Sequence, residues 1–376
     1  MVSVLEEIKK LRAGTPAVID SHNSNRYRLV MQENSGIKTS YCFSTPIYNI
    51  NTRRLVDMKF RMNGDTIYAT GSNADIFVSD RIIMKNADVS VIIDLSSRAT
   101  LLSSNQAQCG SYTLSATTNG VLVKCDLRNL TENSFLVETG RQYLEVRTND
   151  RCFALMKERF RPLFVLSGVG SLDAHGNVIA PVNIGYQLTN DGRYRITVSK
   201  ASPIAQSVLF EMNMYENKLF QDTTVESGNP TLNNAFGGVG FIGNSSAYGE
   251  QWLYSRLDSS RIPELIDKRI FKAVLHMPKL NKSDTELRAF NVATRFCSFG
   301  SSWDNKVSEG DFLSESQTTK GYQSLDVTSV LIDPHTKTLL NSEGLILKSK
   351  IKGSGFSVVS TGDSYYAPQI LEISHL

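Results

Sequence analysis

Three turn sequences constrain this chain more than any other feature, because each stands between two stretches of alternating apolar and polar residues. They are Asn63-Gly64, Asn119-Gly120 and Asp191-Gly192. Both central residues of a type I′ turn need a positive φ, which Asn, Asp and Gly adopt most easily. The three turns therefore predict antiparallel hairpins over residues 58–68, 112–123 and 185–198. Together with further strands at 89–95, 135–138, 142–147 and 163–166, they predict an almost entirely β-sheet protein.

The chain has 376 residues, which is too long for one ordinary β-sandwich, since domains usually hold about 100–200 residues. Residues 151–161 have a helical composition and precede Pro162, so we expect a bridging helix or a crossing loop there. We predict tandem β-sandwich domains divided into four parts. They are an N-terminal amphipathic helix at 1–12, a β-rich domain at 13–158, a small middle β unit at 159–217, and a jelly-roll-like sandwich at 218–376.

The N-terminal segment places Val2, Leu5, Ile8 and Leu11 three residues apart, with charged side chains between them. This spacing predicts a short amphipathic helix and is unlike a signal peptide. So short a helix is marginal alone and needs a partner surface. We expect an assembly helix that docks to a neighbouring subunit, the alternative being that it packs on its own domain.

No segment approaches the roughly 18 consecutive apolar residues of a membrane span. We therefore expect a soluble product made in the cytosol without a signal peptide and with no membrane span. Its final site is expected to be a virion, a phage-like particle or the cell exterior. Forty basic and 37 acidic residues give a net charge of +3, which predicts no nucleic-acid partner.

The sequence has no recognisable catalytic or metal motif. It lacks the G-x-S-x-G, G-x-x-x-x-G-K-[ST] and H-E-x-x-H patterns, and its five histidines stand far apart. The cysteines form no C-x-x-C pair, which predicts reduced thiols at Cys42, Cys109, Cys125, Cys152 and Cys297. Calcium is the one cofactor that the sequence leaves open, because Asp222, Asn229 and Asn233 supply side-chain oxygens in one stretch. The alternative is a solvated loop.

Aromatic residues are concentrated in the last part of the chain. Tyr365 and Tyr366 fall in a polar turn before the final strand, so we expect at least one ring to face outward. With Trp252 and Trp303 they are candidates for contact with a carbohydrate or a protein partner, because exposed rings stack on sugars or fill pockets. The alternative for the two tryptophans is a place in the core.

Several segments of residues 219–376 follow one another in a recognisable order. They include Asp222-Thr223-Thr224-Val225, Asp258-Ser259-Ser260-Arg261-Ile262-Pro263, Asp326-Val327-Thr328 and Gly344-Leu345-Ile346-Leu347-Lys348-Ser349. In this order the segments resemble the DNRLRE domain, a jelly-roll module of microbial surface proteins. The resemblance implies a β-sandwich and, for some relatives, carbohydrate binding or adhesion. We further expect the last strand, at 370–373, to lie beside the first strand of this domain.

These observations favour a non-catalytic structural subunit of a phage-like or cell-surface assembly, such as a tail, fibre, decoration or filament protein. Its partners would be copies of itself or other structural subunits. The alternative is a carbohydrate-binding or adhesive surface protein that recognises a surface glycan through the C-terminal jelly roll. An enzyme acting on polysaccharide is the least favoured hypothesis, because no pair of carboxylates is singled out by the sequence.

Overall fold

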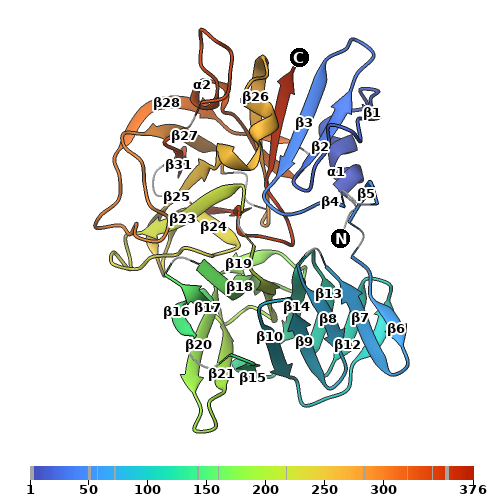
Figure 1. Ribbon diagram of the computed structural model, residues 1–376. Helices are drawn as coiled ribbons and strands as arrows, with labels where there is room; N and C mark the ends of the chain where they lie inside the picture. Colours follow the sequence, from blue (N-terminus) through green and yellow to red (C-terminus); the bar gives the residue numbers. More distant parts are fainter. Residues whose placement is uncertain are drawn as a thin grey trace. The chain divides into compact units, whose positions relative to one another are not determined.

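The computed structural model describes residues 4–49, 52–56, 58–71, 73–141, 144–159, 161–216, 218–282, 285–319, 321–340, 342–351 and 355–376. The regular secondary structure of these residues is almost entirely antiparallel β-strand, in two compact units, which confirms the predicted fold class (Figure 1). Unit 1 comprises Met1–Val56, Lys218–Ala235 and Val239–Leu376. Unit 2 comprises Asp57–Asn217 and Phe236–Gly238.

This division differs from the predicted one in two places. Residues 13–56, expected in an N-terminal domain, belong to unit 1 because β3 (Lys38–Phe43) pairs with β33 (Ile370–His375) near the end of the chain. The expected middle unit at 159–217 is part of unit 2, because β22 (Ser207–Met214) pairs with β14 (Gly120–Asp126). In chain order, unit 2 is thus an insertion within unit 1.

Unit 1 contains two large sheets, besides a two-stranded sheet formed by β4 (Tyr48–Asn49) and β5 (Arg54–Leu55). From one edge to the other, sheet I consists of β1 (Val18–Ile19), β2 (Arg28–Gln32), β3, β33, β26 (Ile270–Pro278), β30 (Tyr322–Asp326) and β29 (Gln317–Thr319). In the same sense, sheet II consists of β28 (Glu309–Glu315), β27 (Leu287–Val292), β31 (Leu345–Ser349), β25 (Gly249–Leu257), β24 (Val239–Ser245) and β32 (Phe356–Ser360), with β23 (Phe220–Glu226) also paired to β25. The other small elements are α2 (Thr328–Leu331) and the 3₁₀ turns Ser259–Arg261 and Pro263–Leu265.

Sheets I and II form a sandwich around one core. Leu275 and Leu371 from sheet I and Leu253 and Leu347 from sheet II belong to the same buried cluster. The last strand was expected beside β23, and this was wrong. β33 lies in the other sheet, between β3 and β26, because its buried residues Leu371 and Ile373 complete the inner face of sheet I.

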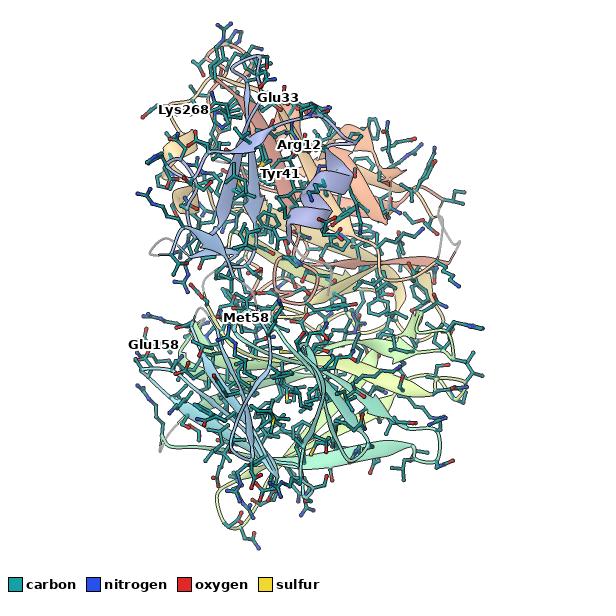
Figure 2. The ribbon with its side chains drawn as sticks, turned by 90° about the vertical axis from the view of Figure 1, so that its right-hand side faces the viewer. Arg12, Glu33, Tyr41, Met58, Glu158 and Lys268 are labelled. Atoms are coloured by element: carbon teal, nitrogen blue, oxygen red, sulfur yellow. The ribbon has the colours of Figure 1, made fainter. Side chains whose placement is uncertain are left out.

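Helix α1 (Val4–Leu11) packs on sheet I of its own unit. Ile8 is fully buried in a cluster with Leu29, Tyr41 and Phe43, whereas Leu5 and Leu11 are half-buried and Val2 lies outside the described residues. Arg12 follows the helix and bonds both the Glu33 carboxylate at 3.0 Å and the Tyr41 hydroxyl at 3.5 Å (Figure 2). Ile8 is therefore not available to a neighbouring subunit, which corrects the expectation of an assembly helix at this position.

The change Ile8→Ala is expected to lower the free energy of unfolding of unit 1 by about 2–4 kcal/mol, since it removes a fully buried side chain and leaves a cavity. Lys9→Ala is the matched control, because Lys9 is exposed and its ion pair with Glu6 lies at the surface. Urea unfolding followed by circular dichroism measures both. Equal stability of the two variants would contradict the packing of α1 on sheet I.

Unit 2 is a second sandwich. Sheet III consists, from edge to edge, of β20 (Val182–Leu188), β21 (Tyr194–Lys200), β15 (Glu132–Thr139), β10 (Ser90–Asp94), β9 (Arg81–Lys85), β8 (Asp75–Val78), β7 (Thr66–Thr70) and β6 (Arg61–Asn63). Sheet IV consists of β11 (Thr100–Ser103), β12 (Gln106–Cys109), β13 (Tyr112–Ala116), β14, β22, β18 (Arg161–Leu172), β17 (Cys152–Glu158) and β16 (Glu145–Asn149), with β19 (Val178–Ala180) on β18. One buried cluster joins the two sheets, with Ile93 and Val137 on one side and Phe164 and Phe210 on the other.

The three predicted hairpins are confirmed as β6–β7, β13–β14 and β20–β21. Gly192 has the expected positive φ, at 81°. Gly120 is needed for a different reason. It already lies in β14, where a Cβ would come within 2.0 Å of the Met212 carbonyl oxygen of β22, so close approach of two strands requires glycine.

The bridging helix or crossing loop expected at 151–161 was wrong, because residues 152–158 form strand β17. Its residues Cys152, Phe153, Ala154, Leu155 and Met156 are buried in succession. A strand covered on both faces shows no alternation, so its sequence cannot be told from a buried helix by periodicity. Pairing with β16 and β18 on either side determines the strand.

Candidate functional site

The candidate site lies where a loop, residues 293–308, covers the outer face of sheet II. Tyr254 and Ile346 alternate with the core residues of β25 and β31 and therefore point away from sheet I. They are nevertheless fully buried, because residues 293–308 fold across them and contribute Phe296. The Tyr254 hydroxyl donates a hydrogen bond to the Val307 carbonyl at 2.6 Å. This small secondary core fixes the loop on the sheet.

Trp252 and Trp303 meet at the margin of this secondary core. Their ring centroids lie 4.9 Å apart at an interplanar angle of 54°, and both side chains are half-buried. The Lys348 ammonium lies 3.4 Å from the Trp252 ring centroid, and the Lys306 ammonium 4.1 Å from that of Trp303. We call these four residues the tryptophan site. Sequence reasoning identified the two tryptophans but not the lysines, whose proximity depends on the β25–β31 pairing and on the loop.

Charged groups already engage much of the tryptophan site. Lys348 forms an ion pair with Glu309, and the Trp252 indole N–H donates to Glu250 at 3.0 Å. Lys306 also donates to the Trp303 carbonyl at 2.8 Å. Each lysine–indole contact contributes about 0.5–1 kcal/mol. A sugar that stacked on the covered ring faces would have to displace an ammonium group, whereas an anionic group could bind the ammonium groups directly.

The tyrosines that we expected to be exposed are placed differently. Tyr365 is buried at 3% exposure, and the Lys218 ammonium lies 3.3 Å from its ring centroid. Tyr366 is half-buried. The expectation that the polar turn would present Tyr365 to a ligand was therefore wrong. The turn carries polar residues because its backbone is buried, and the Ser364 hydroxyl accepts the Ala367 N–H at 3.1 Å.

The three residues proposed for calcium serve separate structural contacts. The Asn233 amide donates to the carbonyls of Ser298 and Ser301 at 2.7 and 2.6 Å, and its oxygen accepts the Ala235 N–H. Asn229 donates to Glu226 at 2.7 Å. Asp222 is buried in β23 and accepts the Gly362 N–H. Among the described residues, no group of three or more His, Cys, Asp or Glu side chains is arranged to hold a metal ion.

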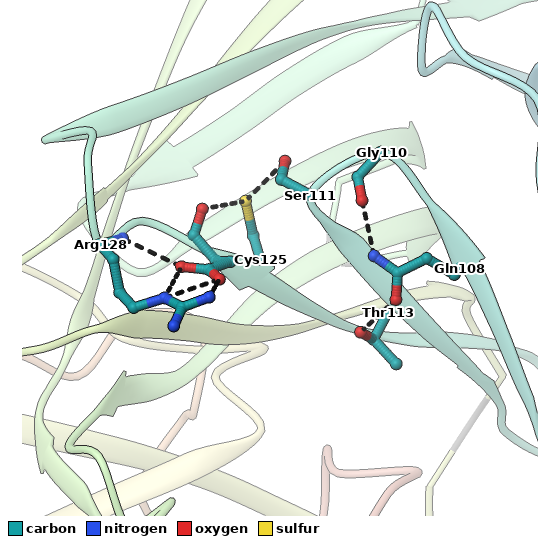
Figure 3. A network of polar contacts seen from close by, with 7 residues as sticks. Gln108, Gly110, Ser111, Thr113, Cys125 and Arg128 are labelled. Carbon is teal, nitrogen blue, oxygen red and sulfur yellow. Dashed lines mark hydrogen bonds and ion pairs between the residues drawn. The ribbon is translucent and has the colours of Figure 1, made fainter.

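Unit 2 has a polar hollow that the sequence did not reveal. Its lining includes Gln108, Gly110, Thr113 and Arg128, and the Gln108 amide donates to the Gly110 carbonyl at 2.6 Å (Figure 3). The Arg128 guanidinium bonds both oxygens of Asp126, and this contact lowers the pKa of the Asp126 carboxyl. The charges of Arg128 and Asp126 thus neutralise each other within the hollow.

The cysteines agree with the prediction of reduced thiols. All five are free, and four of them are buried, the exposed one being Cys297. Burial raises the pKa of Cys42 to about 12, so this thiol is unreactive.

Within the described part of the chain, no helix is long and apolar enough to span a membrane. No family model matches the sequence, and no curated protein matches it either. The likeness to the DNRLRE domain therefore rests on the sequence segments alone.

Proposed function

We propose that this chain is a non-catalytic structural subunit of a larger assembly, such as the tail, fibre or outer layer of a phage-like particle or a cell-surface filament. One observation carries the proposal. Each of the four large sheets has an edge strand that exposes a large apolar side chain to solvent. They are Val18 and Ile19 in β1, Phe312 in β28, Tyr186 and Leu188 in β20, Met62 in β6, and Leu102 in β11.

An exposed sheet edge can pair with a strand from another chain, and proteins that act alone usually protect their edges with charges, prolines or bulges. Apolar side chains at such an edge add a hydrophobic contribution to any pairing. Val18, for example, is 69% exposed at the end of sheet I. β28 and β11 have such protection, in carboxylates and register shifts, whereas β1 and β20 contain no charged residue and no proline. Unprotected edges such as these two suit a subunit whose neighbours cover them, and this supports a role in assembly.

The proposal is tested by light scattering and electron microscopy of the purified full-length chain over a range of concentrations. Ordered oligomers, rings or filaments are expected, and their proportion should rise with concentration. A protein that remains monomeric up to the highest soluble concentration would contradict the proposal.

Carbohydrate binding remains the second candidate, supported by the paired rings of Trp252 and Trp303. Because the Lys306 and Lys348 ammonium groups lie over these rings, the candidate ligand is an acidic sugar, whose negative group would take the place of Glu309 on Lys348. A glycan array probed with the full chain tests this function. Saturable binding that is lost in Trp303→Ala, in a protein that stays monomeric, would favour it over the structural proposal.

A further inference from the structure

Strand β20 forms one edge of sheet III, so half of its backbone N–H and C=O groups point toward β21 and the other half point away from the sheet. Thr189, the residue that follows β20 in the turn to β21, donates its N–H to the Arg193 carbonyl at 2.8 Å. The backbone N–H and C=O groups of the odd-numbered residues of β20 therefore point toward β21. Ile184 donates its N–H at 2.6 Å to the Asp150 carbonyl, which lies outside sheet III. Since backbone groups of an antiparallel strand alternate in direction, even-numbered residues face away from β21.

The second half of β20 is open toward the outside, since no described residue forms a backbone hydrogen bond with it on the side away from β21. The backbone N–H and C=O groups of Tyr186 and Leu188 point away from β21, beyond the part that Asp150 covers. Both side chains are exposed, at 43% and 59%. Tyr186 is held in place by ring contacts with Phe153 and Tyr194, with centroids 5.6 and 6.4 Å away. The open edge is therefore an ordered strand and not a frayed end.

β20 differs from β28 in its charge, and from the other uncharged edge strands in its length, regularity or open side. Strands β1 and β29 have only two and three residues, β11 has a register shift between Leu101 and Ser103, and the Leu280 N–H already bonds β32. The sequence of β20, VNIGYQL, contains no ionisable group apart from the tyrosine hydroxyl, whereas β28 at the edge of sheet II carries Glu309, Asp311 and Glu315. Two copies of β28 placed side by side would bring like charges together, which destabilises strand pairing. Two copies of β20 placed side by side would bring no like charges together. An uncharged edge is compatible with pairing to itself.

We propose that β20 pairs with β20 of a second copy of this chain, antiparallel and across a two-fold axis at Gln187. This inference rests on the proposed structural function and names one of its contacts. Tyr186 then lies opposite the partner's Leu188, and each such pair exchanges two backbone hydrogen bonds. A two-fold axis at Tyr186 would place Leu188 opposite Ile184, whose N–H is already bound to Asp150. The register at Gln187 uses only the open residues.

In this register the two Gln187 side chains face each other across the axis, in a pair without hydrogen bonds between the two backbones, where side chains are closest. Gln187 is exposed in the single chain, so replacing it leaves the core untouched. Arg195 is its partner on β21 and is also exposed. Gln187→Lys consequently brings four positive groups together at the axis and is the strongest disruptive change.

The experiment measures self-association of the full-length chain by sedimentation velocity for wild type, Gln187→Glu, Gln187→Lys and an equimolar mixture of the two variants. Each variant alone is expected to associate at least tenfold more weakly than wild type, with the larger loss for Gln187→Lys. The mixture is expected to recover association, because Glu then faces Lys across the axis. Gln106→Glu, an exposed change on the interior strand β12, is the matched control and should behave as wild type.

The outcomes separate the two proposals. If wild type assembles and both Gln187 variants assemble equally well, the β20 contact is overturned and the structural function stands. If the variants associate weakly but the mixture does not recover, the two-fold register is overturned. If wild type does not associate at any concentration, the proposed function itself fails. Unchanged melting temperatures of the variants confirm that they are folded.

Discussion

Deletion of residues 370–376 is expected to unfold unit 1 while unit 2 keeps its structure. All but the last of these residues form β33, which lies between β3 and β26 in the middle of sheet I. Ile370, Leu371 and Ile373 are all at most 2% exposed, and each contributes about 1.5–3 kcal/mol by its burial. The deletion removes the stabilisation from these three side chains and also the backbone hydrogen bonds of β33 with β3 and β26. The total approaches or exceeds the free energy of unfolding of a usual domain, which is about 5–15 kcal/mol.

Hydrogen exchange followed by mass spectrometry measures this effect region by region. Peptides from residues 4–49, 218–235 and 239–369 should lose protection, whereas peptides from 58–216 should keep it, because the buried cluster of unit 2 contains only its own residues. Deletion of Leu376 alone is the control, since this residue is 58% exposed and follows the strand. Protection that survives the longer deletion throughout unit 1 would contradict the central place of β33.

The features that the sequence predicted correctly are local ones. Each hairpin depends on a turn and on the two strands that flank it, and all of this information lies within about 15 residues. The helix at the N-terminus likewise follows from a spacing visible in one short segment. The pairing of β3 with β33 joins residues more than 300 positions apart, and nothing in either strand's alternation specifies that partner. The unit boundaries could not be predicted for the same reason.

The candidate site shows the same limit at the level of side chains. The chemistry of Trp252 and Trp303 was visible in the sequence, but the lysines over their rings come from β31 and from the loop at 293–308. Asn233 has the composition of a calcium ligand, yet its amide holds that loop in place. Polar residues in a loop can serve an ion, solvent or a buried backbone, and only their surroundings distinguish these uses.

The change Asp222→Asn is expected to stabilise unit 1 by up to about 3–4 kcal/mol at pH 8 and to have little effect near pH 4. Burial raises the pKa of Asp222 to about 7, and the nearby Asp363 raises it further, although Ser255, the Gly362 N–H and Lys218 act in the opposite direction. In the unfolded chain an aspartate has a pKa of about 3.9. The stability from this group is thus present below about pH 4 and is lost as the pH rises towards 7.

His375 acts in the opposite direction over almost the same range. Burial lowers the pKa of His375 to about 4, helped by the positive charges of Arg28, Lys268 and Lys38, while a backbone hydrogen bond raises it. Its ring bonds the Ser40 hydroxyl at 2.8 Å. Because the unfolded pKa is about 6.5, the stability from His375 is present above pH 6.5 and is lost as the pH falls towards 4. In the wild type the two groups offset each other.

Urea unfolding at several pH values between 4 and 8 separates the two contributions. Asp222→Asn should show a free energy of unfolding that rises between pH 4 and 6.5, since only the His375 contribution remains. His375→Gln should show one that falls between pH 4 and 7. The wild type should change less than either variant over this range. Both groups are buried in unit 1, so both contribute to the unfolding of that unit. If the free energy of unfolding changed with pH in the same way in all three proteins, the shifted pKa values of Asp222 and His375 would be contradicted.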